Sequence, residues 1–129
     1  MLNADFWLSH VDEYGIAPWD FDAPPDGRLS SEQVDTSASA IAASGLFNLA
    51  RLAPTVAQRQ AYRDRALMTV ETLSGDFLGD GDDGWEGILR GGVYHIHKDL
   101  GVDESVMWGE FFFVEALQKA RHWLMSDQL

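Results

Sequence analysis

Four stretches of the chain repeat their apolar residues at the spacing of three to four that is typical of an α-helix. The predicted helices cover about 3–14, 36–52, 56–74 and 105–124. A long connection, 15–34, separates the first two of them. Pro18, Pro24 and Pro25 prevent a helix there, because proline lacks the backbone N–H that a helix interior needs. No stretch alternates apolar and polar side chains convincingly, so we expect an all-α chain without strands.

The four predicted helices differ in how much polar surface they offer. The first and the third carry charged side chains along one side, so each is expected to be half exposed. The second, 36–52, has no charged residue before Arg51, and the first turns of the fourth, 105–124, are apolar almost all the way round. Trp108 and the run Phe111–Phe113 are therefore expected to be core residues.

This alternation gives an order of outer, inner, outer and inner helices, which is the order of helical hairpins in a closed α/α toroid. Two hairpins cannot close such a ring. Apolar flanks would remain exposed, and exposed flanks of this kind favour association with another surface.

The starts of the inner helices carry recognisable signals. Asp35 or Thr36 can cap the second helix, and Thr55 with Gln58 matches a capping box for the third. The entrance Asp35-Thr36-Ser37 resembles Asp103-Glu104-Ser105, which suggests a hairpin repeat of 68 residues. Asp35 and Ser37 could face the centre of a toroid, but a capping role explains both.

Composition narrows the classes of partner. The 129 residues are 46% hydrophobic and 23% charged, as expected for one soluble domain or part of one. A net charge of -12 disfavours binding to nucleic acid and to anionic membrane surfaces. No apolar run reaches the roughly 18 residues that a membrane span needs. The absence of Cys excludes disulfides and favours a cytoplasmic location.

Five segments together resemble one known family. They are Pro18–Pro24 (PWDFDAP), Asp35–Leu46 (DTSASAIAASGL), Gly87–Leu89 (GIL), Val93–His95 (VYH) and Ser105–Leu117 (SVMWGEFFFVEAL). In this order they are similar to the unsaturated glucuronyl hydrolases, glycoside hydrolase family 88, over essentially the whole chain. The family usually has Asp-Tyr where this chain has Glu110-Phe111, a change that conserves shape and charge.

The resemblance implies an (α/α)6 toroid of six helical hairpins, of which residues 1–129 would be about one third, the C-terminal part of a single domain. It implies hydrolysis of unsaturated uronic-acid oligosaccharides, the products of polysaccharide lyases. In that reaction an Asp protonates the ring double bond and activates a water, and the resulting hemiketal opens to release the neighbouring sugar. No cofactor is implied. The family's catalytic aspartates precede the matched region, so no catalytic residue is assigned and the chain is expected to be inactive alone.

Three substrate-binding residues are expected, which are Tyr94, His95 and Trp19. Tyr94 matches the family's Tyr before His in a late loop, which is implied to border the substrate carboxylate. His95 and His97 would point the same way in an extended segment and could face the sugar. Trp19, in an Asp- and Pro-rich loop, could stack on a sugar ring. Each also has a plainer explanation as a half-buried loop tyrosine, a surface histidine or an aromatic anchor of the loop.

Metal sites are not expected. The two histidines lack an evident third zinc ligand. The acidic loop Asp80–Gly84 fails the calcium-loop template, because Gly84 falls on a ligand position. An anionic substrate would need nearby donors, for which the candidates are Arg28, Arg90, Lys98, His95 and His97.

Two further functions stay open. The chain could be a carbohydrate-binding helical module with Trp19, Trp85 and Tyr94 as its stacking platform. Alternatively, it could be a helical-repeat interaction protein, whose exposed flanks dock on a partner or on a second copy.

Overall fold

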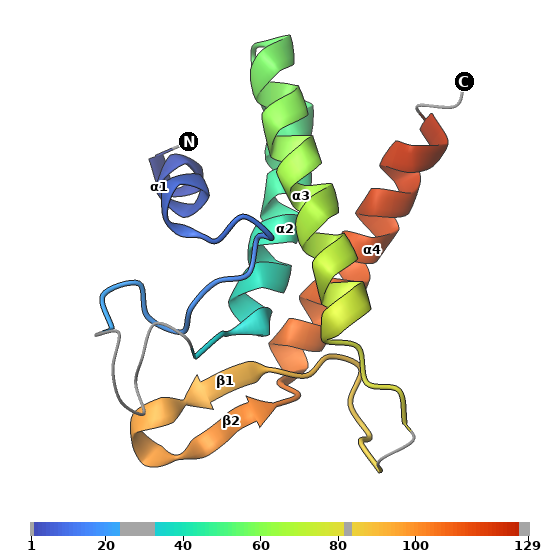
Figure 1. Cartoon of the computed structure of the whole chain (residues 1–129). Helices are drawn as coiled ribbons and strands as arrows, with labels where there is room; N and C mark the ends of the chain where they lie inside the picture. The colour runs from blue at the N-terminus through green and yellow to red at the C-terminus, as the bar shows by residue number, and fades with distance from the viewer. Residues whose placement is uncertain (1, 24–32, 82–83, 127–129) are drawn as a thin grey trace.

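The computed structural model describes residues 2–23, 33–81 and 84–126. Its elements are α1 (Leu2–His10), α2 (Thr36–Leu52), α3 (Val56–Asp76), β1 (Gly92–His95), a 3-10 turn (Ile96–Lys98), β2 (Leu100–Glu104) and α4 (Met107–Ser126). Figure 1 shows α2 beside α3 and α4, with α1 on its other side. The hairpin of β1 and β2 lies at the end of the molecule where α2 and α4 begin. In the described part of the chain, no helix combines the length and hydropathy that crossing a membrane requires.

Several residues of the sequence argument lie outside the described part of the chain. They are Pro24, Pro25, Arg28, Asp82 and Asp83.

The predicted starts of α2 and α3 are confirmed. Asp35 caps α2, because its Oδ1 accepts the backbone N–H of Ser37 at 3.0 Å. Thr55 caps α3 in the same way, accepting the backbone N–H of Gln58 at 3.2 Å. These contacts satisfy backbone donors that a helix leaves unpaired at its first turn.

The second copy of the entrance motif does not cap α4, so the repeat interpretation is wrong at this point. Asp103 and Glu104 belong to β2, and the hydroxyl of Ser105 donates instead to the carbonyl of Leu89 at 2.5 Å. The Ser105 hydroxyl therefore fastens the 85–89 loop to the start of α4 rather than capping the helix.

The core lies where α2 packs between α3 and α4. Small residues, such as Ala43 and Ala50 of α2, Ala66 of α3 and Ala116 of α4, let the three helices approach closely, and Phe47 fills the centre. Each of these five residues is fully buried. This packing explains why α2 has no charged residue before its last turn.

A smaller cluster closes the end nearest the hairpin. Ile16, Ala40, Leu73, Leu89 and Phe113 pack together there. This cluster joins the 85–89 loop to α2, α3 and α4, and so places the hairpin relative to the helices.

The first helix is shorter than expected, ending at His10 instead of residue 14. Asp12 ends it by accepting the backbone N–H groups of Tyr14 and Ile16, at 3.1 and 2.6 Å. Gly15 follows with φ of 82°, a left-handed conformation that glycine adopts readily. Tyr14 is consequently exposed outside the helix rather than part of an apolar stripe.

The expectation of no strands is wrong, although the chain is mostly helical. β1 and β2 pair antiparallel, with Val93 opposite Val102 and His95 opposite Leu100. The sequence does not predict these strands because they are short. In addition, Gly92 and Val93 are both buried, whereas an alternating pattern would expose one of them. An irregularity in the pairing between these two residues accounts for the broken pattern.

The expected burial of the α4 aromatics is confirmed fully for Phe113 and in part for Phe112, which is half-buried against the same cluster. Phe113 is fully buried, but Phe111 is 62% exposed and Trp108 is 36% exposed. Met107, Phe111 and Val114, at helical spacing, form an exposed apolar face that we call the α4 stripe. This exposed face of α4 is an apolar flank of the kind that the sequence argument anticipated.

A polar contact joins α2 and α4 halfway along their length. The Ser44 hydroxyl donates to a carboxylate oxygen of Glu115, and the Lys119 ammonium lies 3.0 Å from the same oxygen and 2.8 Å from the hydroxyl. The hydrogen bond from Ser44, followed by that from Lys119, holds the pKa of Glu115 below its ordinary value. The carboxylate therefore stays ionised to a lower pH than an ordinary glutamate does.

This contact predicts an acid-sensitive contribution to stability. Because the folded-state pKa is lowered, the stabilisation is present above the unfolded-state pKa and is lost as the pH falls through the folded-state value. We expect Glu115→Gln to melt below the parent protein at about pH 6 and to converge on it as the pH is lowered through the folded-state pKa of Glu115. Glu71→Gln, an exposed control on α3, should show no such convergence. A Glu115→Gln deficit that is constant with pH would contradict the ionised contact.

Candidate functional site

One carboxylate organises the end of the molecule where α2 begins. Oδ1 of Asp35 accepts three donors: the backbone N–H of Ser37, the Ser37 hydroxyl at 2.7 Å and the backbone N–H of Val93 at 3.2 Å. Asp35 thus caps α2 and also ties β1 to it. A second link is the Thr36 hydroxyl, which donates to the carbonyl of Arg90 at 2.6 Å.

The same network positions two aromatic rings. The indole N–H of Trp108 donates to the Ser37 hydroxyl at 3.0 Å, which fixes the ring at the first turn of α4. The Tyr94 ring of β1 lies 5.7 Å from the Trp108 ring, centroid to centroid. Tyr94 is 58% exposed, so this pair is an open aromatic surface supported from behind by Asp35 and Ser37.

Trp108 is the site residue that sequence reasoning placed in the core. The indole N–H of Trp108 could have indicated this role, because a tryptophan that packs against the protein needs a hydrogen-bond partner for its N–H. Ser37, two residues after the capping Asp35, supplies that partner across 71 positions of sequence.

His95 and Trp19 belong to a second group. The ring of His97 lies 6.0 Å from that of His95 and 5.3 Å from that of Trp19, so His97 joins the two residues. His97 lies in the 3-10 turn rather than in an extended segment, as the spacing argument assumed. Nδ1 of His95 is buried without a hydrogen-bond partner among the described residues.

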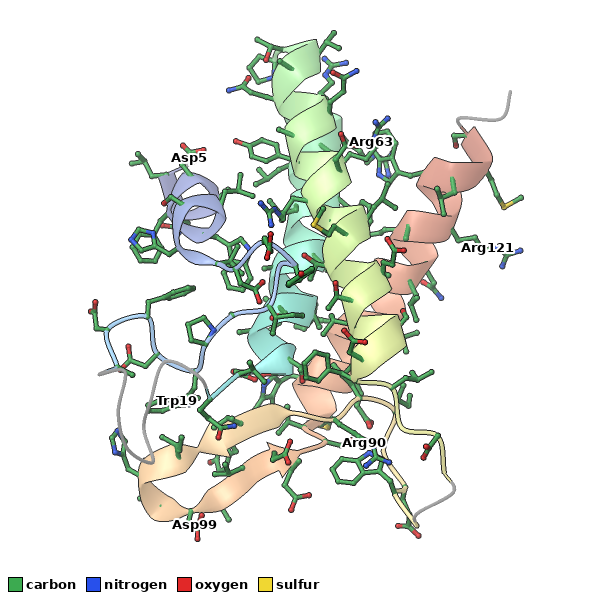
Figure 2. All side chains as sticks on the ribbon, viewed as in Figure 1. Asp5, Trp19, Arg63, Arg90, Asp99 and Arg121 are labelled. Atoms are coloured by element: carbon green, nitrogen blue, oxygen red, sulfur yellow. The ribbon has the colours of Figure 1, made fainter. Side chains whose placement is uncertain are left out.

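The predicted substrate-binding residues therefore fall into two groups. Tyr94 and His95 are neighbours in β1, and neighbouring strand residues point to opposite faces. Tyr94 turns toward Trp108, whereas His95 turns toward His97 and Trp19. Figure 2 shows Trp19 beside the hairpin, where the connection after α1 passes it.

Trp85 does not join Tyr94 or Trp19 in a stacking platform. The guanidinium carbon of Arg90 lies over the Trp85 ring, 4.7 Å from the centroid of that ring. Arg90 also contacts Asp80 at 3.3 Å, and this contact holds it in the 77–91 loop, away from the two aromatic groups (Figure 2). Among the candidate counter-charges, Lys98, His95 and His97 are the ones that the structure places on the hairpin.

Chemically, the described residues at this end of the molecule offer exposed aromatic faces and hydrogen-bonding groups that can bind a ligand. Asp35 is occupied by its three donors. Within residues 2–23, 33–81 and 84–126, no three His, Asp or Glu side chains come close enough to hold a metal ion.

The chain is similar in sequence to two kinds of curated enzyme. It is 36% identical over 115 residues to an unsaturated glucuronyl hydrolase from Bacillus sp. (strain GL1), a match that covers 88% of this chain and 30% of the relative. It is 28% identical over 114 residues to an unsaturated chondroitin disaccharide hydrolase from Streptococcus agalactiae serotype III (strain NEM316), covering 88% of this chain and 28% of the relative. No family model matches.

Solved structures give the same correspondence. The crystal structure of the Bacillus sp. GL1 hydrolase matches with a TM-score of 0.78 at 35% identity, covering 90% of this chain and 30% of the solved one. An unsaturated glucuronyl hydrolase specific for heparin matches with a TM-score of 0.83 at 25% identity, covering 95% and 32%. The expected resemblance and the toroid fold class are confirmed, and the chain spans about 30% of the length of these relatives.

Proposed function

We propose that this chain, which corresponds in sequence and fold to about one third of an unsaturated glucuronyl hydrolase, is the C-terminal part of one toroid domain with that activity. The whole enzyme would cleave unsaturated uronyl oligosaccharides by hydrating the sugar double bond. Residues 1–129 would contribute substrate-binding groups, while the catalytic acid would come from the rest of the protein. We also propose that the whole enzyme is located in the cytoplasm.

The observation that carries this proposal is the position of the Tyr94 and Trp108 pair. It lies at the end where both inner helices, α2 and α4, begin (Figure 1). The pair offers a ring face for a sugar and a phenol O–H that can donate to its carboxylate.

The second group would bind a different part of the oligosaccharide. Trp19 supplies a further ring face, and the exposed His97 beside it supplies ring nitrogens that can hydrogen-bond to a sugar hydroxyl. The α4 stripe supports the same proposal, because an inner helix of a closed ring has neighbours on both sides.

Without those neighbours, the isolated chain is expected to associate with a second copy through the α4 stripe, which sedimentation at rising concentration would detect.

A chimera tests the proposed function. The matching 30% of the Bacillus sp. (strain GL1) hydrolase is replaced by this chain, and turnover of an unsaturated uronyl disaccharide is followed by loss of the double-bond absorbance. We expect turnover by the chimera and none by the chain alone. Binding of the disaccharide by the isolated chain, together with a folded but inactive chimera, would favour the carbohydrate-binding module instead.

Tyr94 provides the residue-level test within the chimera. Tyr94→Phe removes one hydrogen bond to a charged group and is expected to raise KM about tenfold or more. Tyr14→Phe is the matched control, because Tyr14 is 56% exposed and Tyr94 58% exposed, while the carbonyl of Tyr14 accepts the Thr72 hydroxyl of α3. Equal kinetics for the two variants would remove Tyr94 from the substrate site.

A further inference from the structure

A cavity of about 240 Å³ lies between the C-terminal halves of α2 and α4, at the far end of these helices from the hairpin. Phe47 and Trp123 give it aromatic walls. Its polar lining comes from Asn48 and Arg51 of α2 and from Gln118, Lys119 and His122 of α4. It shares no residue with the two aromatic groups at the hairpin. Its volume is below the roughly 300–1,000 Å³ typical of drug-sized ligands, so a small ligand fits best.

The charge of this cavity is opposite to that of the chain. The chain has 21 acidic and 9 basic residues, yet Arg51, Lys119 and His122 line the cavity and none of its described lining residues is acidic. Lys119 is balanced by Glu115, whose carboxylate lies 3.0 Å away. Among the described residues, the side chains of Arg51 and His122 have no hydrogen-bond or ion-pair partner; the one bond to His122 is the Ser126 hydroxyl donating to its backbone carbonyl.

Arg51 therefore supplies one uncompensated positive charge on the α2 side of the cavity, and His122 supplies a ring nitrogen on the α4 side. A planar guanidinium binds a carboxylate through two parallel hydrogen bonds. One net charge suits a monoanion better than a doubly charged phosphate or sulfate, because Glu115 behind Lys119 would repel the second charge. The Trp123 ring suits a ligand whose carboxylate is attached to a flat or apolar body.

We propose that this cavity binds a small organic monocarboxylate. Its carboxylate accepts hydrogen bonds from Arg51 and His122, and its body packs against Trp123 and Phe47. The site is separate from the hairpin groups and serves as a second binding site on the same two helices.

The experiment titrates the chain with benzoate, with benzamide as the neutral isostere and sulfate as the dianion, by calorimetry and by NMR of the Trp123 indole. Benzoate is expected to bind saturably and to shift the Trp123 signal, with Kd at least fivefold below those of benzamide and sulfate. Benzoate and benzamide binding equally would overturn the carboxylate site. Tighter binding of sulfate would overturn the monoanion assignment.

Arg51→Gln is expected to weaken benzoate binding about fivefold to tenfold. Arg121→Gln is the matched control, since it removes the same charge from α4, where Figure 2 shows Arg121 pointing away from the other helices. Arg121→Gln should change the Kd for benzoate less than twofold. Equal losses of benzoate affinity in the two variants would show that the effect comes from the overall charge of the chain and not from Arg51. Arg51→Lys retains the charge without the planar fork and should bind at an intermediate level, which keeps the test available if Arg51→Gln does not fold.

Discussion

Phe113→Ala is expected to lower the free energy of unfolding of the chain by about 3–5 kcal/mol, the range for truncating a fully buried phenylalanine. The Phe113 ring is fully buried and packs with Ala40 of α2, Leu73 of α3 and Leu89 of the 85–89 loop. Its removal leaves a cavity where these elements meet the start of the hairpin. Urea denaturation followed by circular dichroism measures the change.

Phe111→Ala is the matched control, two residues earlier on the same helix. Its ring is 62% exposed, so the same truncation should cost less than about 1 kcal/mol in the isolated chain. Equal losses for the two variants would mean that α4 packs with a different face toward α2 and α3.

Asp35→Ala is expected to have the second largest effect, lowering the free energy of unfolding by about 2–3 kcal/mol. The substitution removes the cap of α2 and leaves the backbone N–H of Val93 without its acceptor. It also frees the Ser37 hydroxyl, which holds the indole of Trp108. Amide hydrogen exchange of Val93 should speed up as the hairpin separates from α2.

Asp35→Asn separates the hydrogen bonds from the charge. The Asn side-chain oxygen can accept the same donors, and Asn caps helices about as well as Asp. The variant should stay within about 1 kcal/mol of the parent protein and keep the exchange protection of Val93. Loss of that protection in the Asn variant would show that the negative charge, not the acceptor, holds β1 in place.

The sequence predicted the helices better than the parts between them. The extents of α2 and α3 follow from strong local signals, because capping side chains and apolar spacing act within one turn. α1 ends early because Asp12 captures two backbone donors, an interaction that competes with the helix and that spacing alone cannot reveal. β1 and β2 depend on their mutual pairing, so neither short strand carries a clear pattern by itself.

The site was predictable in part. Tyr94 was named from the family resemblance, His95 from its spacing with His97, and Trp19 from its Asp- and Pro-rich loop. All three lie at or beside the hairpin. Trp108 was missed because its role depends on a contact with Ser37, 71 positions away, that no local pattern encodes. Phe111 was assigned to the core for a related reason: its apolar side chain indicates burial, but not whether the residues that bury it belong to this chain.

The most direct test of the claim that α2 and α4 are inner helices of a larger ring compares Phe111→Ala in two settings. In the isolated chain the substitution is expected to change the free energy of unfolding by less than about 1 kcal/mol. In the chimera with the remainder of the Bacillus sp. (strain GL1) hydrolase, where a neighbouring helix should cover the α4 stripe, it is expected to cost about 3 kcal/mol or more. A cost below about 1 kcal/mol in the chimera as well would contradict the claim.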